Sequence, residues 1–114
     1  MNEANHGFLT QVRKAAGKRL LFLPHALQQM MRPDRMISEN EVRVVIFSGE
    51  IIEDYPEDVR GHSCLMLGWS SVGRPVHVVC APKSEYLAII SAQTFLLERK
   101  VALLGKEKVW RVTR

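Results

Sequence analysis

The sequence of 114 residues is poor in cysteine and aromatic residues and has no long hydrophobic run. No apolar segment approaches the roughly 18–20 residues of a membrane span, and residues 1–6 lack the pattern of a secretory signal. Cys64 and Cys80 both lie in apolar stretches, which favours buried, reduced thiols. We therefore expect a cytoplasmic protein without membrane contact. Its length and its 46% of hydrophobic residues fit a single domain over residues 1–114.

The sequence lacks the motifs of metal binding and of phosphate binding by a glycine-rich loop. The four histidines and two cysteines show neither C-x-x-C nor H-x-x-x-H spacing, so we expect no metal site. No glycine-rich phosphate loop is present. The carboxylates around Tyr55-Pro56 lack an EF-hand pattern and read as a solvated loop. We therefore expect no cofactor.

Positive charge gathers at the two ends of the chain. Residues 1–24 carry four basic side chains against one acidic, and residues 96–114 carry six against two. Residues 25–95 carry six basic and nine acidic side chains. Basic ends suit contact with a polyanion such as RNA, although surface charge that serves only solubility fits equally well.

The first half of the sequence predicts helices. Apolar spacing indicates one over residues 8–16, and Pro24 is a typical first-turn residue for a second that ends at Pro33-Asp34. Ser38 and Glu41 form an S-x-x-E capping box, which predicts a third helix over 39–48. Gly49 is expected to end it in the left-handed conformation.

After residue 49 the hydrophobic period changes to two. This pattern predicts strands over 50–55, 63–69, 74–81 and 86–95, with a hairpin loop at 70–73. The apolar run 20–23 is too short to classify. We therefore predict an α+β fold in which two or three N-terminal helices pack on one face of a four-stranded antiparallel sheet. Residues 96–114 are expected to form a basic C-terminal extension after the sheet, and residues 1–21 a basic N-terminal extension.

Five stretches carry a resemblance to a known family. They are His25-Ala26-Leu27, ISENEV (37–42), GEIIEDYPED (49–58), SCLMLG (63–68) and RPVHVV (74–79). Because these stretches occur in this order, the sequence resembles the bacterial family catalogued as domain of unknown function 4258 over residues 22–95. That family resembles the RelE-like, barnase-type ribonuclease toxins. The resemblance implies a metal-independent ribonuclease of a toxin–antitoxin pair, with RNA and a protein antitoxin as partners.

The resemblance also implies site residues. The family's helix histidine falls on His25, the arginine just before its next helix on Arg35, and its strand histidine on His77, close to the loop arginine Arg74. The last strand of the family usually carries a threonine and a tyrosine. Here the corresponding residues are Ser91 and Gln93, and Gln93 cannot replace a phenol as acid or base.

RNA cleavage without a metal needs a base, an acid and cationic donors for the phosphate. His25, at a helix N-terminus that disfavours the charged ring, suits the base, and His77 the acid. Arg35 and Arg74 would hold phosphate. If helices cover the Val76/Val78/Cys80 face, His77 points to the other face. The two histidines then meet only if the N-terminus of the His25 helix reaches around a sheet edge.

Other interpretations remain open. His25 also fits a polar helix end, and His77 a satisfied core histidine. The same fold would serve as a non-catalytic module that binds RNA or protein, or as a protein that adds a partner strand to its sheet edge.

Overall fold

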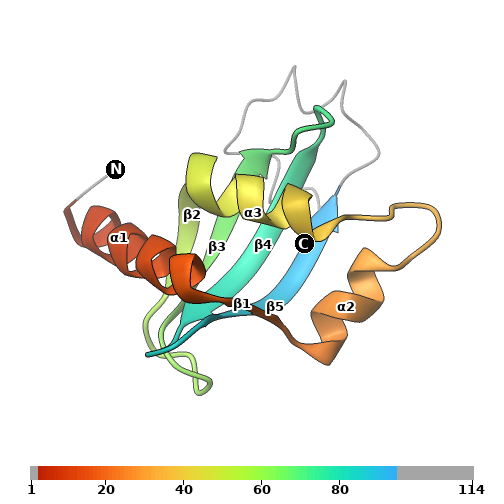
Figure 1. Cartoon of the computed structure of the whole chain (residues 1–114). Coiled ribbons are helices and arrows are strands. Elements are labelled where there is room, and N and C mark those ends of the chain that lie inside the picture. The colour runs from red at the N-terminus through yellow and green to blue at the C-terminus, as the bar shows by residue number, and fades with distance from the viewer. Residues whose placement is uncertain (1–2, 95–114) are drawn as a thin grey trace.

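The computed structural model describes residues 3–94, and within them the chain forms three helices and five strands (Figure 1). They are α1 (Glu3–Lys18), β1 (Leu20–Phe22), α2 (Pro24–Met30), α3 (Glu39–Ser48), β2 (Glu50–Tyr55), β3 (Ser63–Trp69), β4 (Pro75–Pro82) and β5 (Leu87–Thr94). The predicted mixed α+β class is confirmed. The predicted C-terminal extension lies outside the described residues. Within the described part, no helix is both long and apolar enough to cross a membrane.

The sheet differs from the prediction in strand number and direction. Its order is β1-β5-β4-β3-β2, and the expected antiparallel meander runs from β2 to β5. A fifth strand, β1, pairs in parallel with the first half of β5, with Leu20 opposite Leu87. The prediction of a four-stranded, wholly antiparallel sheet is therefore wrong. A strand of three residues shows no period, and its partner lies far along the chain.

The helices occupy two different places around the sheet. Helices α1 and α3 pack together on one face, α3 over β3 and β4 (Figure 1). Helix α2 instead lies beside β5, at the sheet edge (Figure 1). The expectation that all N-terminal helices cover one face thus holds for α1 and α3 only. Strand β1 pairs with only the first half of β5. The edge of the second half faces α2, whose side chains contact it.

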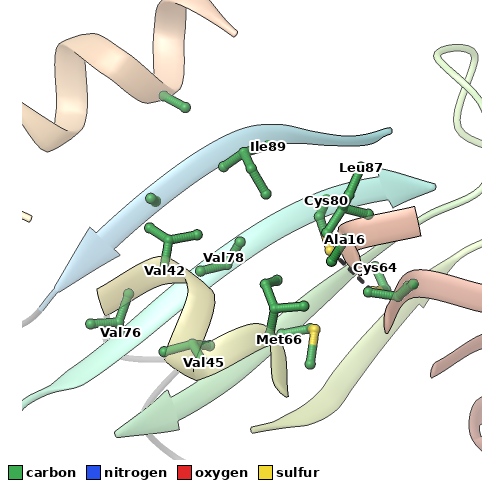
Figure 2. Packing of buried hydrophobic residues seen from close by; sticks show 14 of the residues in the cluster. Ala16, Val42, Val45, Cys64, Met66, Val76, Val78, Cys80, Leu87 and Ile89 are labelled. Atoms are coloured by element: carbon green, nitrogen blue, oxygen red, sulfur yellow. Dashed lines mark hydrogen bonds between the residues drawn. The ribbon is translucent and has the colours of Figure 1, made fainter. Parts of the chain in front are cut away.

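One apolar cluster fills the space between the sheet and the helices (Figure 2). As predicted, Val76, Val78 and Cys80 share the face of β4 that contacts the helices, and all are fully buried. Helix α1 contributes Val12 and Ala16, which are also buried. The residues before position 22, predicted as an extension, therefore complete the core. Burial of this kind stabilises the fold by roughly 25 cal/mol per Å² of apolar surface.

The two cysteines are buried cross-strand neighbours on β3 and β4. Their Sγ atoms lie 3.9 Å apart in a thiol–thiol hydrogen bond. This contact with Cys64, together with burial, raises the pKa of the Cys80 thiol. Both residues therefore act as small apolar core residues at neutral pH.

Polar groups close both ends of α3. At the start, Ser38 and Glu41 form the predicted capping box, with the Glu41 N–H donating to Ser38 Oγ at 3.0 Å. At the end, the guanidinium of Arg13 donates to the carbonyls of Ile46 and Gly49 at 2.9 and 3.0 Å. These carbonyls would otherwise lack partners within the helix. One cation of the basic N-terminal region thus has a structural task.

Gly49 is required for a close approach and not for a left-handed turn. Its φ of −85° and ψ of −167° are extended, so the predicted left-handed conformation is wrong. A Cβ at this position would lie 2.6 Å from the carbonyl oxygens of both Leu67 and Val45. Both obstacles are backbone atoms, which cannot rotate away. The end of α3 therefore sits against β3 only because residue 49 has no side chain.

We expect Gly49→Ala to lower the free energy of unfolding by about 2 kcal/mol, because the backbone of α3 or β3 must shift. Gly7→Ala in α1 is the matched control, since a Cβ there meets nothing within 4 Å. That variant should be neutral or more stable by up to about 1 kcal/mol. Urea unfolding measures both. Equal stability of the two variants would contradict this role of Gly49.

Candidate functional site at the end of strand β5

A small open hollow lies where β5 ends, between α2 and the loop that follows it. Its volume is about 20 Å³, enough for one water molecule or one phosphate oxygen. It is lined by Gln29, Arg32, Arg35, Ile37, Gln93 and Thr94. Two of these, Arg35 and Gln93, are among the residues predicted for the site. Two guanidinium groups and two side-chain amides supply hydrogen-bond donors of the kind that suit an anion.

A tight turn brings the two arginines together. The sequence R-P-D-R places Pro33 and Asp34 in the middle of the turn, which the Arg35 N–H closes by donating to the Arg32 carbonyl at 3.0 Å. Both guanidinium groups approach the Asp34 carboxylate, at 3.6 and 3.7 Å. One carboxylate balances one of the two cations, so the cluster keeps a positive charge.

Arg35 is the group best placed to receive a ligand. Its side chain is 34% exposed, yet its Nε is buried. That Nε forms no hydrogen bond within residues 3–94, and the Asp34 oxygen at 3.7 Å is too far for one. A buried N–H without an acceptor costs about 1–3 kcal/mol. An anionic oxygen in the hollow would supply the missing acceptor.

His77, Ser91 and Gln93 lie together on the sheet face away from α1 and α3. His77 on β4 is directly opposite Gln93 on β5, and Ser91 is opposite Val79. A bulge follows, because the register shifts between Val79 and Cys80. Gln93 is exposed and also lines the hollow, so it connects His77 with Arg35. The register therefore brings three predicted residues to one face of the sheet, and the hollow adds Arg35 beside Gln93.

Burial determines the charge of His77. Its side chain is 6% exposed, and burial lowers the pKa of the imidazole to about 4. The ring is therefore neutral at pH 7. A neutral ring suits the acceptance of a proton, whereas the predicted role of acid requires the charged form.

His25 lies at the start of α2, which is fixed to β5 at two points. The Leu23 N–H donates to the Ile89 carbonyl at 3.0 Å, and the Ala92 N–H donates to Gln29 Oε1 at 2.9 Å. Pro24 occupies the first turn, as predicted. His25 is exposed and lies one turn before Gln29, on the same side of the helix. The helix thus begins at the sheet edge beside β5, whereas His77 lies on the neighbouring strand β4.

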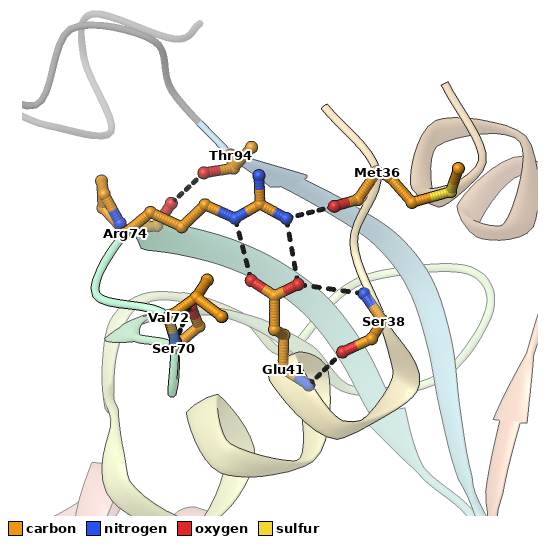
Figure 3. Close-up of polar contacts among 8 residues, drawn as sticks. Met36, Ser38, Glu41, Ser70, Val72, Arg74 and Thr94 are labelled. Atoms are coloured by element: carbon orange, nitrogen blue, oxygen red, sulfur yellow. Dashed lines mark hydrogen bonds and ion pairs between the residues drawn. The ribbon is translucent and has the colours of Figure 1, made fainter. Parts of the chain in front are cut away.

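Arg74 has a different environment from the one predicted (Figure 3). Its guanidinium grips the Glu41 carboxylate with Nε and Nη2, at 2.8 and 2.9 Å. Nη2 also donates to the Met36 carbonyl. Met36 is the neighbour of Arg35, so Arg74 ties the loop that carries Arg35 to the start of α3 and β4. These contacts favour a positioning role over the predicted phosphate contact.

Glu41 is therefore a buried carboxylate with charged and backbone donors. Burial raises the pKa of Glu41, but hydrogen bonds from Arg74, Ser38 and Ser70 outweigh it, and the pKa falls below 4.5. The carboxylate is ionised at neutral pH. It serves the capping box and Arg74 at the same time (Figure 3).

Arg32 and Gln29 line the hollow but were not among the predicted site residues. A signal for both is present in the sequence, since His25, Gln29 and Arg32 follow each other at helical spacing. The R-P-D-R turn is a second signal. Neither indicates which sheet edge the helix would meet.

A separate polar cluster lies where α1 crosses β2. His62 Nε2 is 2.6 Å from an Asp54 oxygen, and its ring stacks on Phe8 with centroids 3.7 Å apart. This contact fixes the first half of α1. Within residues 3–94, no three histidine, cysteine or acidic side chains gather to hold a metal.

The fold and site together define a small α+β domain with a cationic hollow at the end of β5, whose neighbour β4 carries a buried histidine. The chain belongs to the family described as Domain of unknown function (DUF4258), which it matches over residues 22–93. The matched region contains all six predicted site residues, and α1 precedes it. No curated protein and no solved structure matches the chain.

Proposed function

We propose that this protein is a small RNA-binding ribonuclease, related to the RelE-like, barnase-type toxins, that cleaves RNA without a metal ion. The hollow that Arg35 and Gln93 share, next to His77, carries the proposal. The hollow offers an anion-binding group, and His77, opposite Gln93 on the neighbouring strand, offers a proton acceptor. RNA supplies the matching anion, a backbone phosphate, next to a hydroxyl that can lose a proton.

Each of the site residues has a separate role in the proposed cleavage. Neutral His77 accepts the proton of the 2′-hydroxyl, whose oxygen then attacks phosphorus. The bond from phosphorus to the 5′-oxygen breaks, and a 2′,3′-cyclic phosphate forms. His25, exposed at the start of α2, gives a proton to the departing oxygen. Arg35 stabilises the negative charge on the phosphate, and Ser91 and Gln93 position the ribose and phosphate.

A toxin of this kind would act on cytoplasmic RNA and be held inactive by a protein antitoxin. The second candidate function is a non-catalytic module that binds RNA or protein on the same fold. Two points favour it: Gln93 stands where the family resemblance implies a tyrosine, and Glu41 holds the guanidinium of Arg74.

The test is RNA cleavage in EDTA by wild type, His25→Ala and His77→Ala. We expect wild type to leave 2′,3′-cyclic phosphate ends and each variant to be about 100-fold slower, the usual contribution of one acid or base. Gln28→Ala, exposed on α2 outside the hollow, is the control and should match wild type. Equal rates for the histidine variants and wild type would refute the roles of the histidines. Binding without cleavage would favour the non-catalytic module.

A further inference from the structure

A second basic concavity lies at the other end of β5, between α1 and the turn that joins β4 to β5. Its volume is about 340 Å³. Three lysines line it: Lys14 and Lys18 from α1 and Lys83 from the turn. No carboxylate lines it among the described residues. We name these three residues the lysine groove.

Two of the three lysines are held in place by the backbone. Lys18 Nζ donates to the Ser84 carbonyl at 2.7 Å, and Lys83 Nζ donates to the Arg60 carbonyl. An ammonium group has three N–H donors, so each can still bind an anion. Lys14 is exposed on the same side of α1, one turn before Lys18. The groove therefore presents positioned positive charge.

The groove accounts for part of the basic N-terminal region. Of its cations, Arg13 is committed to the carbonyls at the end of α3. Lys14 and Lys18 instead lie around the concavity, where Lys83 from a distant part of the sequence joins them. Three ammonium groups that repel one another gain stability when a polyanion binds between them.

The groove and the candidate site lie at opposite ends of β5. Pro82, in the groove wall, pairs with Leu87, the first residue of β5, and Thr94, the last, lines the hollow near Arg35. The eight residues of β5 separate the two places by roughly 25 Å. A single nucleic-acid strand carries several phosphates over that length.

We propose that the lysine groove binds backbone phosphates of the same RNA strand whose scissile phosphate occupies the hollow at Arg35. This inference rests on the proposed function and extends it: the substrate is a single strand long enough to reach both places. Phosphate contacts by lysine position a strand without reading its bases. The groove therefore adds affinity for long RNA and leaves the chemical step unchanged.

The test is binding of fluorescent, 2′-O-methylated oligonucleotides, which resist cleavage, of about 12 and about 4 nucleotides. Anisotropy titrations compare wild type with Lys14→Gln/Lys83→Gln. We expect wild type to bind the longer probe at least about 10-fold more tightly, and the double variant to lose that advantage. In the double variant, the negative slope of log K against log salt should become shallower by about 1.4, which is about 0.7 for each of the two lost phosphate contacts on a single strand.

Arg43→Gln is the matched control, because Arg43 is exposed on α3 and lines neither the groove nor the hollow. It should keep the length dependence of wild type. A second readout is cleavage of long RNA, for which the double variant should raise KM and leave kcat unchanged. Lys14→Arg keeps the charge and should behave as wild type.

The outcomes separate this inference from the proposed function. If the double variant keeps the length dependence and salt slope of wild type, the groove binds no RNA, while cleavage at the hollow stands. If wild type binds neither probe, the proposed function fails and this inference fails with it.

Discussion

Replacing Arg74 by methionine should lower the free energy of unfolding by about 3 kcal/mol, near the cost of leaving one partner of a buried ion pair alone. Glu41 is 6% exposed on its side chain, so water cannot replace the two guanidinium N–H groups that it loses. The hydrogen bond to Met36 is lost as well. We therefore expect weaker docking of the loop that carries Arg35, in addition to lower stability. Urea unfolding measures the first effect, and RNA affinity the second.

A double-mutant cycle isolates the pair. Glu41→Gln keeps a side-chain acceptor at the third position of the helix, so the capping box survives. In Arg74→Met/Glu41→Gln no buried charge remains, and we expect the double variant to be more stable than Arg74→Met alone. If Arg74→Met stays within about 0.5 kcal/mol of wild type, as exposed ion pairs do, the positioning role is wrong.

Between pH 6.5 and pH 4, the protein should lose about 3 kcal/mol of stability through His77 alone. Burial lowers the pKa of His77 from 6.5 to about 4 in the folded state. In this interval the unfolded chain binds a proton that the folded chain does not. Stability is therefore full above pH 6.5 and falls as pH decreases towards 4. Urea unfolding at half-unit intervals of pH measures the slope.

His77→Gln is the diagnostic variant, because glutamine keeps polar atoms but does not titrate. It should flatten the stability profile between pH 6.5 and 4.5. The lowered pKa of Glu41 adds a further loss only below about 4.5, where its unfolded form takes up a proton, so this contribution should persist in the variant. An unchanged slope in His77→Gln would show that His77 titrates normally in the folded protein.

Local signals in the sequence predicted most of the fold. The capping box at Ser38 and Glu41 predicted α3 to the residue, and period-two alternation predicted β2 to β5 to within one residue at each described end. These signals are local, since caps and alternation act over a few residues. Strand β1 was missed because three residues have no measurable period and only pairing with β5 makes them a strand.

The site was partly predictable. Alternation placed His77 on the face of β4 away from Val76 and Val78, but its partner on β5 could not be read from the turn. Counting back from the Pro82–Leu87 pair puts His77 opposite Ala92, and the bulge between Val79 and Cys80 shifts the partner to Gln93. Two facts required the tertiary structure: α2 lies at the edge of β5, and Glu41 binds Arg74. Arg74 and Glu41 are far apart in the sequence, and no periodic pattern links a hairpin loop to a helix cap. The lysine groove could not be predicted for the same reason, because its residues come from α1 and the β4–β5 turn, which are far apart in the sequence.

The most direct test of the account is whether cleavage depends on a single 2′-hydroxyl. A defined RNA is first mapped in EDTA, and the nucleotide on the 5′ side of the cut is then replaced by its 2′-deoxy form. We predict that wild-type protein cuts the all-ribose strand and leaves the substituted strand intact at that position, because no hydroxyl is present for His77 to activate. Cleavage of both strands at that position, or of neither, would contradict the proposed ribonuclease.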